Sequence, residues 1–168
     1  MNLSQALLAE TGHEFASTRR ALEGLPPEKA DWQPYEKGMT LGQLAVHVAT
    51  LPNWGPLTLA QDELDLSQPF PPQPKFTDEK SLLALFDMTV SGHNAALAAA
   101  DNETLMKPWS LIKDGKVLMT LPKAAVLRGT VYNHLYHHRG QLVVYRRLLG
   151  LPVPVTYFNT ADNPGFQG

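Results

Sequence analysis

The amino-acid sequence predicts an all-α fold, a four-helix bundle with long crossover connections and a small β-hairpin between the third and fourth helices. Four segments repeat apolar residues every three or four positions, which is the period of an amphipathic helix. One Asp-Gly pair between two short apolar runs predicts a tight hairpin. The chain has 168 residues, a length that suits one domain. We therefore expect a single domain over residues 1–168, with an irregular C-terminal tail over residues 151–168.

The first two helices are bounded by residues that start or stop helices. The first is expected from about Leu3 to Leu22, because Gly24 and the pair Pro26-Pro27 end its apolar pattern. The second follows Thr40, a residue type suited to a helix N-cap, and continues through the run LGQLAVHVATL. Pro52 predicts a kink or a break in this second helix.

The third and fourth helices are longer. The third is expected to begin near Thr77, where the run T-D-E-K resembles a capped, acidic first turn. Its buried stripe is expected to comprise Leu82, Phe86, Thr89 or Val90, Ala96 and Ala100. The fourth helix is expected from about Lys123 to Leu149, with Gly150 and Pro152 ending it.

The connections between these helices are long. Residues 61–76 contain four prolines, which exclude a helix or a central strand. Fully extended, such a segment reaches roughly 50 Å, whereas a five-turn helix is about 27 Å long. The linker is therefore long enough to leave the second and third helices parallel. Asp114-Gly115 is the predicted hairpin turn.

The composition excludes several classes of function. Fourteen Lys and Arg residues against sixteen Asp and Glu residues leave a formal charge of −2, which does not suit binding to nucleic acid or to an anionic membrane. No run of eighteen apolar residues predicts a membrane-spanning helix, and the first residues lack the basic region of a signal peptide. We expect a cytoplasmic protein. The chain has no cysteine, so any metal site must use imidazole and oxygen ligands.

Two histidines interrupt the apolar stripe of the fourth helix. His134 and His138 stand where leucines would continue the stripe, and side chains four residues apart have Cβ atoms about 6 Å apart. Two imidazoles at this spacing can bind one metal ion. Alternatively they are ordinary buried histidines, each needing hydrogen-bond partners at a cost of about 1–3 kcal/mol if unmet. His47 also faces inward, between Leu44 and Leu51, and three inward histidines on two helices favour a divalent metal ion.

The remaining histidines and the arginines of the fourth helix have less specific interpretations. His93 also faces inward. It could be a fourth ligand, but we favour a packed residue or one that lies behind the ligands. His137 is expected at the surface or at a helix interface, and His13 in solvent. Three arginines in the second half of the fourth helix are expected to complement the helix dipole rather than to form an anion site: Arg139, Arg146 and Arg147.

Three stretches of the chain resemble the DinB-like (YfiT-like) metal-binding four-helix proteins. They are GMTLGQLAVHVATL over residues 38–51, NHLYHHRGQLVVYRRLLG over residues 133–150, and LPVPVTYFNTADNP over residues 151–164. The second stretch is the most specific, and the third resembles the Pro-rich, Tyr-containing end of the family with an acidic position at Asp162. Together with the helix lengths, the likeness covers nearly the whole chain.

The resemblance implies an up-down-down-up bundle that is commonly a homodimer. It implies one zinc or nickel ion held by a histidine of the second helix and an H-x-x-x-H pair of the fourth, which here are His47, His134 and His138. Relatives of known activity are mostly transferases or isomerases that use a low-molecular-weight thiol such as bacillithiol or mycothiol. The sequence departs from the family at Pro52, Asn53 and Trp54, which indicates a reshaped site on that side.

Three hypotheses for the function follow. A three-histidine site leaves a position open for water or substrate, as catalytic sites do, so a metal-dependent transferase acting on a small molecule with a thiol cofactor is the leading one. A non-catalytic metal-containing stress-response or binding module is the second, and a hydrolase that uses a metal-activated water is the third. No catalytic residue is identified. A site open to a solvent-connected pocket would separate the enzymes from the module.

Overall fold

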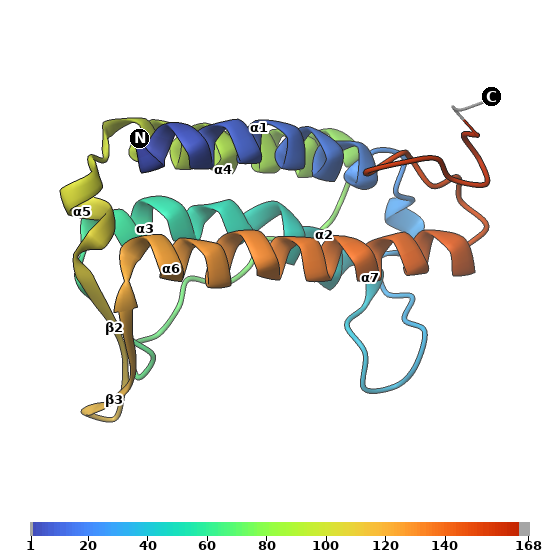
Figure 1. The fold of residues 1–168 in the computed structure, drawn as a ribbon. Helices are drawn as coiled ribbons and strands as arrows, with labels where there is room; N and C mark the ends of the chain where they lie inside the picture. The colour runs from blue at the N-terminus through green and yellow to red at the C-terminus, as the bar shows by residue number, and fades with distance from the viewer. Residues whose placement is uncertain (1, 165–168) are drawn as a thin grey trace.

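The computed structural model describes residues 2–164 of the chain, which is mostly helical with a small sheet at one end (Figure 1). In chain order the elements are α1 (Leu3–Leu22), η1 (Pro27–Lys29), α2 (Leu41–Thr50), η2 (Leu51–Asn53), α3 (Trp54–Ala60), β1 (Glu63–Asp65), α4 (Glu79–Ala99), α5 (Asn102–Met106), β2 (Pro108–Lys113), β3 (Lys116–Pro122), α6 (Lys123–Val126), η3 (Leu127–Asn133) and α7 (His134–Leu148). The segments η1 and η2 are 3₁₀ turns, and η3 is a π-helix. Within the described residues, none of the helices combines the length and apolar character needed to cross a membrane.

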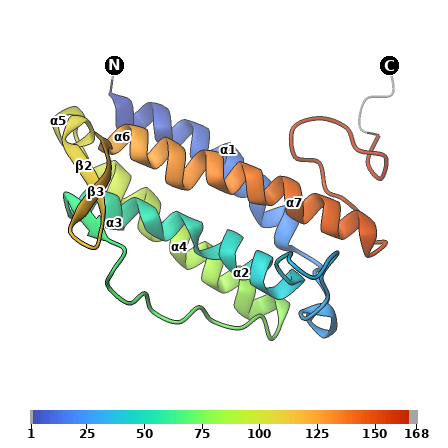
Figure 2. The same cartoon turned by 90° about the horizontal axis from the view of Figure 1, so that it is seen from below.

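The long helices run in two opposite directions along the molecule (Figures 1 and 2). α1 and the continuous course α6–η3–α7 run away from the end that carries the sheet, whereas α2, α3 and α4 run toward it. α4 packs against α1 and α2, and α7 packs against the same two helices. The extended linker over residues 66–78 leads back along the molecule from the sheet to the start of α4 (Figure 2).

The start of α2 is held by reciprocal hydrogen bonds. The Thr40 hydroxyl accepts from the Gln43 amide N–H at 3.2 Å, and the Gln43 side-chain oxygen accepts from the Thr40 N–H at 2.9 Å. This capping box satisfies two N–H groups that the helix leaves unpaired. The interruption predicted at Pro52 takes the form of the 3₁₀ turn η2, after which the helical course continues as α3 to Ala60.

α4 begins slightly later than predicted, because Asp78 rather than Thr77 is its N-cap and accepts from the Ser81 N–H at 2.8 Å. The buried face of α4 comprises Leu82, Phe86, Thr89, His93 and Leu97. The prediction that Ala96 belongs to this face is wrong. A step of four residues from His93 leads to Leu97, and Ala96 is only half-buried.

The β-hairpin forms at the predicted turn. Asp114 and Gly115 have φ angles of 49° and 71°, the left-handed conformations that a tight turn between twisted antiparallel strands requires. The expectation of a two-stranded hairpin was incomplete, because β1 of the linker pairs in parallel with the other edge of β2. β1 is an edge strand, in keeping with the proline-rich segment that follows it. The side chain of Trp109 on β2 is fully buried.

The fourth helical course ends as predicted, at Gly150 with a φ of 70°. Residues 151–164 then form an irregular tail against the helices, and residues 165–168 of the predicted tail lie outside the described residues. Arg146 donates to the carbonyls of Ala21, Glu23 and Pro152.

The other two arginines of this helix also have specific partners. Arg147 pairs with Asp162 of the tail. Buried Arg139 pairs with Glu14 of α1 at 2.7 Å and donates to the Tyr157 hydroxyl. The expectation that these cations merely complement the helix dipole was therefore too weak, because together with Arg146 they attach the tail and α1 to α7.

The apolar core has two parts that meet along α7 and its neighbours. One part surrounds the facing sides of α1, α2, α4 and α7 and includes Phe15, Leu44, Phe86 and Leu142. The other lies at the sheet end and includes Leu105, Leu127 and Tyr132. Burying each large apolar side chain stabilises the fold by about 1.5–3 kcal/mol. His47 and His134 face each other from opposite helices of this packed framework.

Candidate metal centre

Three histidines from two helices converge at one point. His47 projects from α2, His134 is the first residue of α7, and His138 lies one turn further along α7. The Nε2 atoms of His47 and His134 are 3.3 Å apart, and one ring nitrogen from each of the three residues lies within 4.8 Å of the others. Elsewhere in residues 2–164, no group of three or more His, Asp or Glu side chains meets this criterion.

Polar groups of α7 and of the turn before it lie beside the rings of His138 and His134. His138 Nδ1 lies 2.7 Å from the Gln141 side-chain oxygen, which can only accept, so Nδ1 carries the proton and Nε2 has a free lone pair. Gln141 in turn donates from Nε2 to His137 Nε2 over 3.1 Å. The Thr130 carbonyl lies near the ring of His134 and opposes the lowering of its pKa. The Nε2 atom of His134 faces His47.

The π-helix η3 explains why the Thr130 carbonyl is available. In a regular α-helix the His134 N–H would donate to this carbonyl, four residues earlier. Here the His134 N–H donates to Val131 instead. The Thr130 carbonyl therefore lacks this bond where the π turns of η3 pass into α7. Such turns are found frequently at functional sites.

The environment keeps the three imidazoles neutral. Burial is the main cause that lowers the pKa of each of them, and the pKa of His47 falls to about 4 with further lowering by His138 and His134. The nearby Thr130 carbonyl opposes the shift at His134, and the hydrogen bond that the Gln141 side-chain oxygen accepts opposes it at His138. Metal ions bind neutral imidazole, so the site presents its ligands in the required form at neutral pH.

The geometry fits a divalent cation. Two imidazole nitrogens that each lie 2.0–2.1 Å from a tetrahedral ion are about 3.4 Å from one another, which is close to the 3.3 Å between His47 and His134. The hydrogen bond to Gln141 holds the His138 ring with Nε2 unprotonated. This bond is the kind of outer contact that orients histidine ligands. One ion would satisfy all three nitrogens at once.

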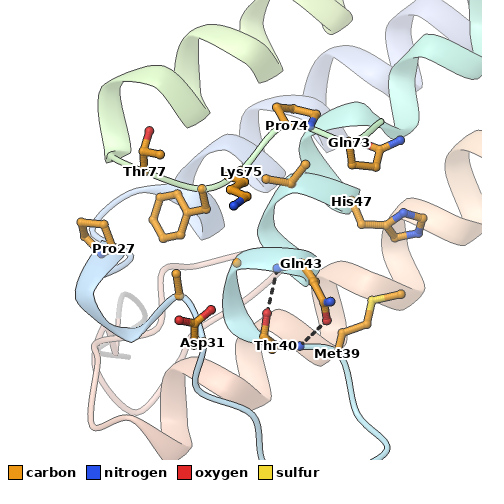
Figure 3. A pocket seen from close by; sticks show the side chains of 14 residues that line it. Pro27, Asp31, Met39, Thr40, Gln43, His47, Gln73, Pro74, Lys75 and Thr77 are labelled. Atoms are coloured by element: carbon orange, nitrogen blue, oxygen red, sulfur yellow. Dashed lines mark hydrogen bonds between the residues drawn. The ribbon is translucent and has the colours of Figure 1, made fainter. Parts of the chain in front are cut away.

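Two pockets reach this site from different sides. The larger one, about 980 Å³, lies between the N-terminal half of α2, the turn that contains Pro27 and Asp31, and the end of the linker, and His47 lines it (Figure 3). The second, about 460 Å³, is lined by His138, Gln141 and Tyr35. Met39 lines both pockets. Two of the three histidines, His47 and His138, thus line open cavities.

His93 does not join the three histidines. It is fully buried on α4, where its Nε2 lies 3.2 Å from the Tyr132 hydroxyl and its ring packs edge-on against Phe15. Burial lowers the pKa of His93 to about 4, and the Pro52 carbonyl opposes this shift without meeting hydrogen-bond geometry at Nδ1. A Cβ atom on Gly55 would lie 2.0 Å from that Nδ1, so α3 can approach α4 here only with glycine. His93 is a packed core residue, as favoured from the sequence.

The other two histidines lie at the surface, as expected. His137 is exposed and contacts the site only through Gln141 and through its ring contact with His138. His13 is exposed on α1 and stacks on Tyr157 of the tail. Sequence reasoning missed Gln141 and Thr130. The spacing of Gln141 three residues after His138 was a usable signal, whereas no residue pattern announced the π-helix.

Comparisons with known proteins identify the fold and the family. The chain matches the model of the DinB family over residues 1–164. A solved structure of a DinB-like protein from Bacillus subtilis is similar with a TM-score of 0.69 at 19% identity, covering 90% of this chain and 96% of that one. A DinB-like protein from Bacillus cereus is similar with a TM-score of 0.68 at 23% identity, covering 91% and 97%. No curated protein matches the chain.

Proposed function

Because this chain belongs to the DinB family, we propose that it is a divalent-metal protein, and an enzyme of the transferase or isomerase type that uses a small-molecule thiol. His47, His134 and His138 would hold one zinc or nickel ion, with Gln141 and Thr130 keeping two of the rings in the binding orientation. We also assign the fold as an up-down-down-up four-helix bundle, on the basis of the helix directions in Figures 1 and 2.

The observation that carries the proposal is that two of the three histidines line open cavities. A metal that only stabilises a bundle is normally enclosed by four protein ligands, whereas a catalytic metal has three and an open position. Here His47 lines one open cavity and His138 lines another. Two cavities at one site suit a reaction between two molecules, such as a thiol and its acceptor. This access supports an enzyme over a non-catalytic metal-containing module.

The chemistry follows from what the chain supplies and lacks. A divalent cation supplies Lewis acidity, which favours the thiolate form of a thiol near neutral pH. The chain has no cysteine, so the thiol must come from a small molecule. The protein's own residues hold the three imidazoles neutral, orient them, and shape the two cavities between which Met39 lies.

Elemental analysis of untagged protein tests the metal. We expect about one zinc or nickel ion per chain. The His134→Ala and His138→Ala variants should lose it, because each removes one of three ligands. The His13→Ala variant is the matched control, since His13 is an exposed histidine on another helix and should leave the metal content unchanged. Full metal occupancy in a double variant lacking His134 and His138 would contradict the assignment.

Cobalt-substituted protein tests the use of a thiol. Bacillithiol, mycothiol or a similar thiol should produce a sulfur-to-cobalt charge-transfer band, absent from the His47→Ala variant and retained in His13→Ala. If carboxylates and water exchange at the cobalt but no thiol does, the transferase proposal fails and a hydrolase becomes the better hypothesis. If nothing exchanges, the metal is structural and the protein is a binding module.

A further inference from the structure

The larger pocket has features that the three histidines do not explain. Its volume of about 980 Å³ lies at the upper end of the range for small-molecule sites. His47 is the only member of the three-histidine group that lines it, and that ring points across toward α7 (Figure 3). Most of the wall comes from the start of α2 and from the end of the linker, residues 73–77.

Lys75 brings a positive charge to this pocket. Its side chain extends from the linker into the space that faces α2 (Figure 3). Within the described residues, Lys75 has neither an ion pair nor a hydrogen bond, although five other cationic side chains form six ion pairs. These six pairs involve Arg19 twice and Lys123, Arg128, Arg139 and Arg147 once each, so the unpaired ammonium of Lys75 is free to bind an anion.

Gln43 contributes an oriented neutral donor. The capping box uses the side-chain oxygen of Gln43 to accept from the Thr40 N–H at 2.9 Å, so its amide NH₂ is left to donate into the pocket. Figure 3 shows this NH₂ group on the side of Met39, toward His47. Buried Val46 and Phe76 supply apolar surface between the linker and α2.

Asp31 restricts the charge of the ligand. Its carboxylate lines the same pocket, in which Lys75 is the only Lys or Arg among the lining residues (Figure 3). One ammonium group neutralises a monocarboxylate, whereas a phosphate with a charge near −2 would keep a negative charge that no other cation of the lining neutralises, beside the charge of Asp31. The pocket therefore suits a carboxylate better than a phosphate.

From this arrangement we infer that the larger pocket binds an organic monocarboxylate. Its carboxylate pairs with Lys75, its apolar part lies against Val46 and Phe76, and its other end comes within reach of the Gln43 amide on the side of His47. That this ligand is a reactant of the metal site rests on the proposed function. The binding itself does not, and can be measured without any reaction.

Three probes of one shape test the inference: benzoate, phenyl phosphate and benzyl alcohol. Each is titrated into isotope-labelled full-length protein, in zinc-loaded and chelator-treated form, while NMR follows the Gln43 side-chain amide and the Lys75 backbone amide. Benzoate should shift both signals in both forms, and the other two probes should bind more weakly. If benzyl alcohol binds as well as benzoate, or if benzoate shifts neither signal, the inference is wrong.

Variants identify the charge that binds. Lys75→Met should weaken benzoate binding about two- to fivefold, the range of a solvent-exposed ion pair, and added salt should reduce the difference. Asp31→Asn should strengthen binding, and Lys113→Met, on the exposed hairpin, should leave it unchanged. If benzoate binds only when zinc is present and Lys75→Met has no effect, the carboxylate is a ligand of the metal and the inference is overturned. Failure of the thiol experiment would leave this result intact.

Discussion

Replacing Gln141 with Leu should weaken zinc binding about tenfold. In the protein, the Gln141 side-chain oxygen lies 2.7 Å from His138 Nδ1 and holds the proton there, which leaves Nε2 for the metal. Leucine keeps a similar size but offers no acceptor, so His138 can also adopt the tautomer with the proton on Nε2. Loss of such a partner costs about 10- to 100-fold in metal affinity. Gln141 is exposed, so water can partly replace its oxygen, and we expect the lower end of this range.

The measurement is a competition titration with a chromophoric zinc chelator at pH 7.5. Gln141→Glu should retain wild-type affinity, because a carboxylate also accepts from His138 Nδ1. His137→Ala is the second control, since it removes only the group to which Gln141 donates over 3.1 Å and should change affinity by less than about threefold. An unchanged affinity in Gln141→Leu, or an equal loss in His137→Ala, would refute the assignment of Gln141 as the residue that positions His138.

Four further outcomes are expected. Zinc affinity should stay nearly constant above the usual histidine pKa of about 6.5. It should fall as the pH drops toward the lowered pKa of His47, about 4, because protons then compete with zinc for the imidazole nitrogens. Isothermal titration at several pH values measures this. The pKa of His93 is also lowered to about 4, so the free energy of unfolding is highest above about pH 6.5 and falls on acidification, by about 3 kcal/mol at pH 4. Urea unfolding of metal-free protein should show a smaller loss for His93→Gln than for wild type. Gly55→Ala should lower the urea midpoint of unfolding, because the clash of the new Cβ with His93 at 2.0 Å outweighs a helix-propensity gain of about 0.5–1 kcal/mol. Gly92→Ala has open space around it and should raise the midpoint. A rise in both variants would contradict the packing at His93. Light scattering at micromolar concentration should show a homodimer, as the family resemblance implies, and a purely monomeric protein would remove that expectation.

Local sequence patterns predicted most of the fold. The bounds of α1, the N-cap at Thr40, the interruption at Pro52 and the turn at Asp114-Gly115 depend on residues within a few positions of one another. Neighbouring residues in the chain determine such features through helix period, capping and the φ angles that a turn requires. Where the period was ambiguous, as between Ala96 and Leu97 on α4, the prediction chose the wrong side of the helix.

The choice of the three histidines also came from the sequence. His47, His134 and His138 each occupy a position that the helical period directs inward, and polar groups placed there need a common partner. The same reasoning could not decide the role of His93, which faces inward with the same period. Only the packing of α3 against α4 shows that His93 lies against Gly55 and Tyr132, apart from the other three.

By itself, then, the sequence determined the four long helical segments, the N-cap at Thr40, the hairpin turn and the inward histidines, because each of these is a short-range property of the chain. The tertiary structure alone decided the third strand of the sheet, the partners of the three arginines on α7, the π turn that presents Thr130 to His134, and the pocket that joins residues 73–77 to α2. Most of these features join segments that are far apart in the chain. The π turn is different, because it is a local change of the backbone that no residue pattern announces. Their energies depend on contacts that no local pattern encodes.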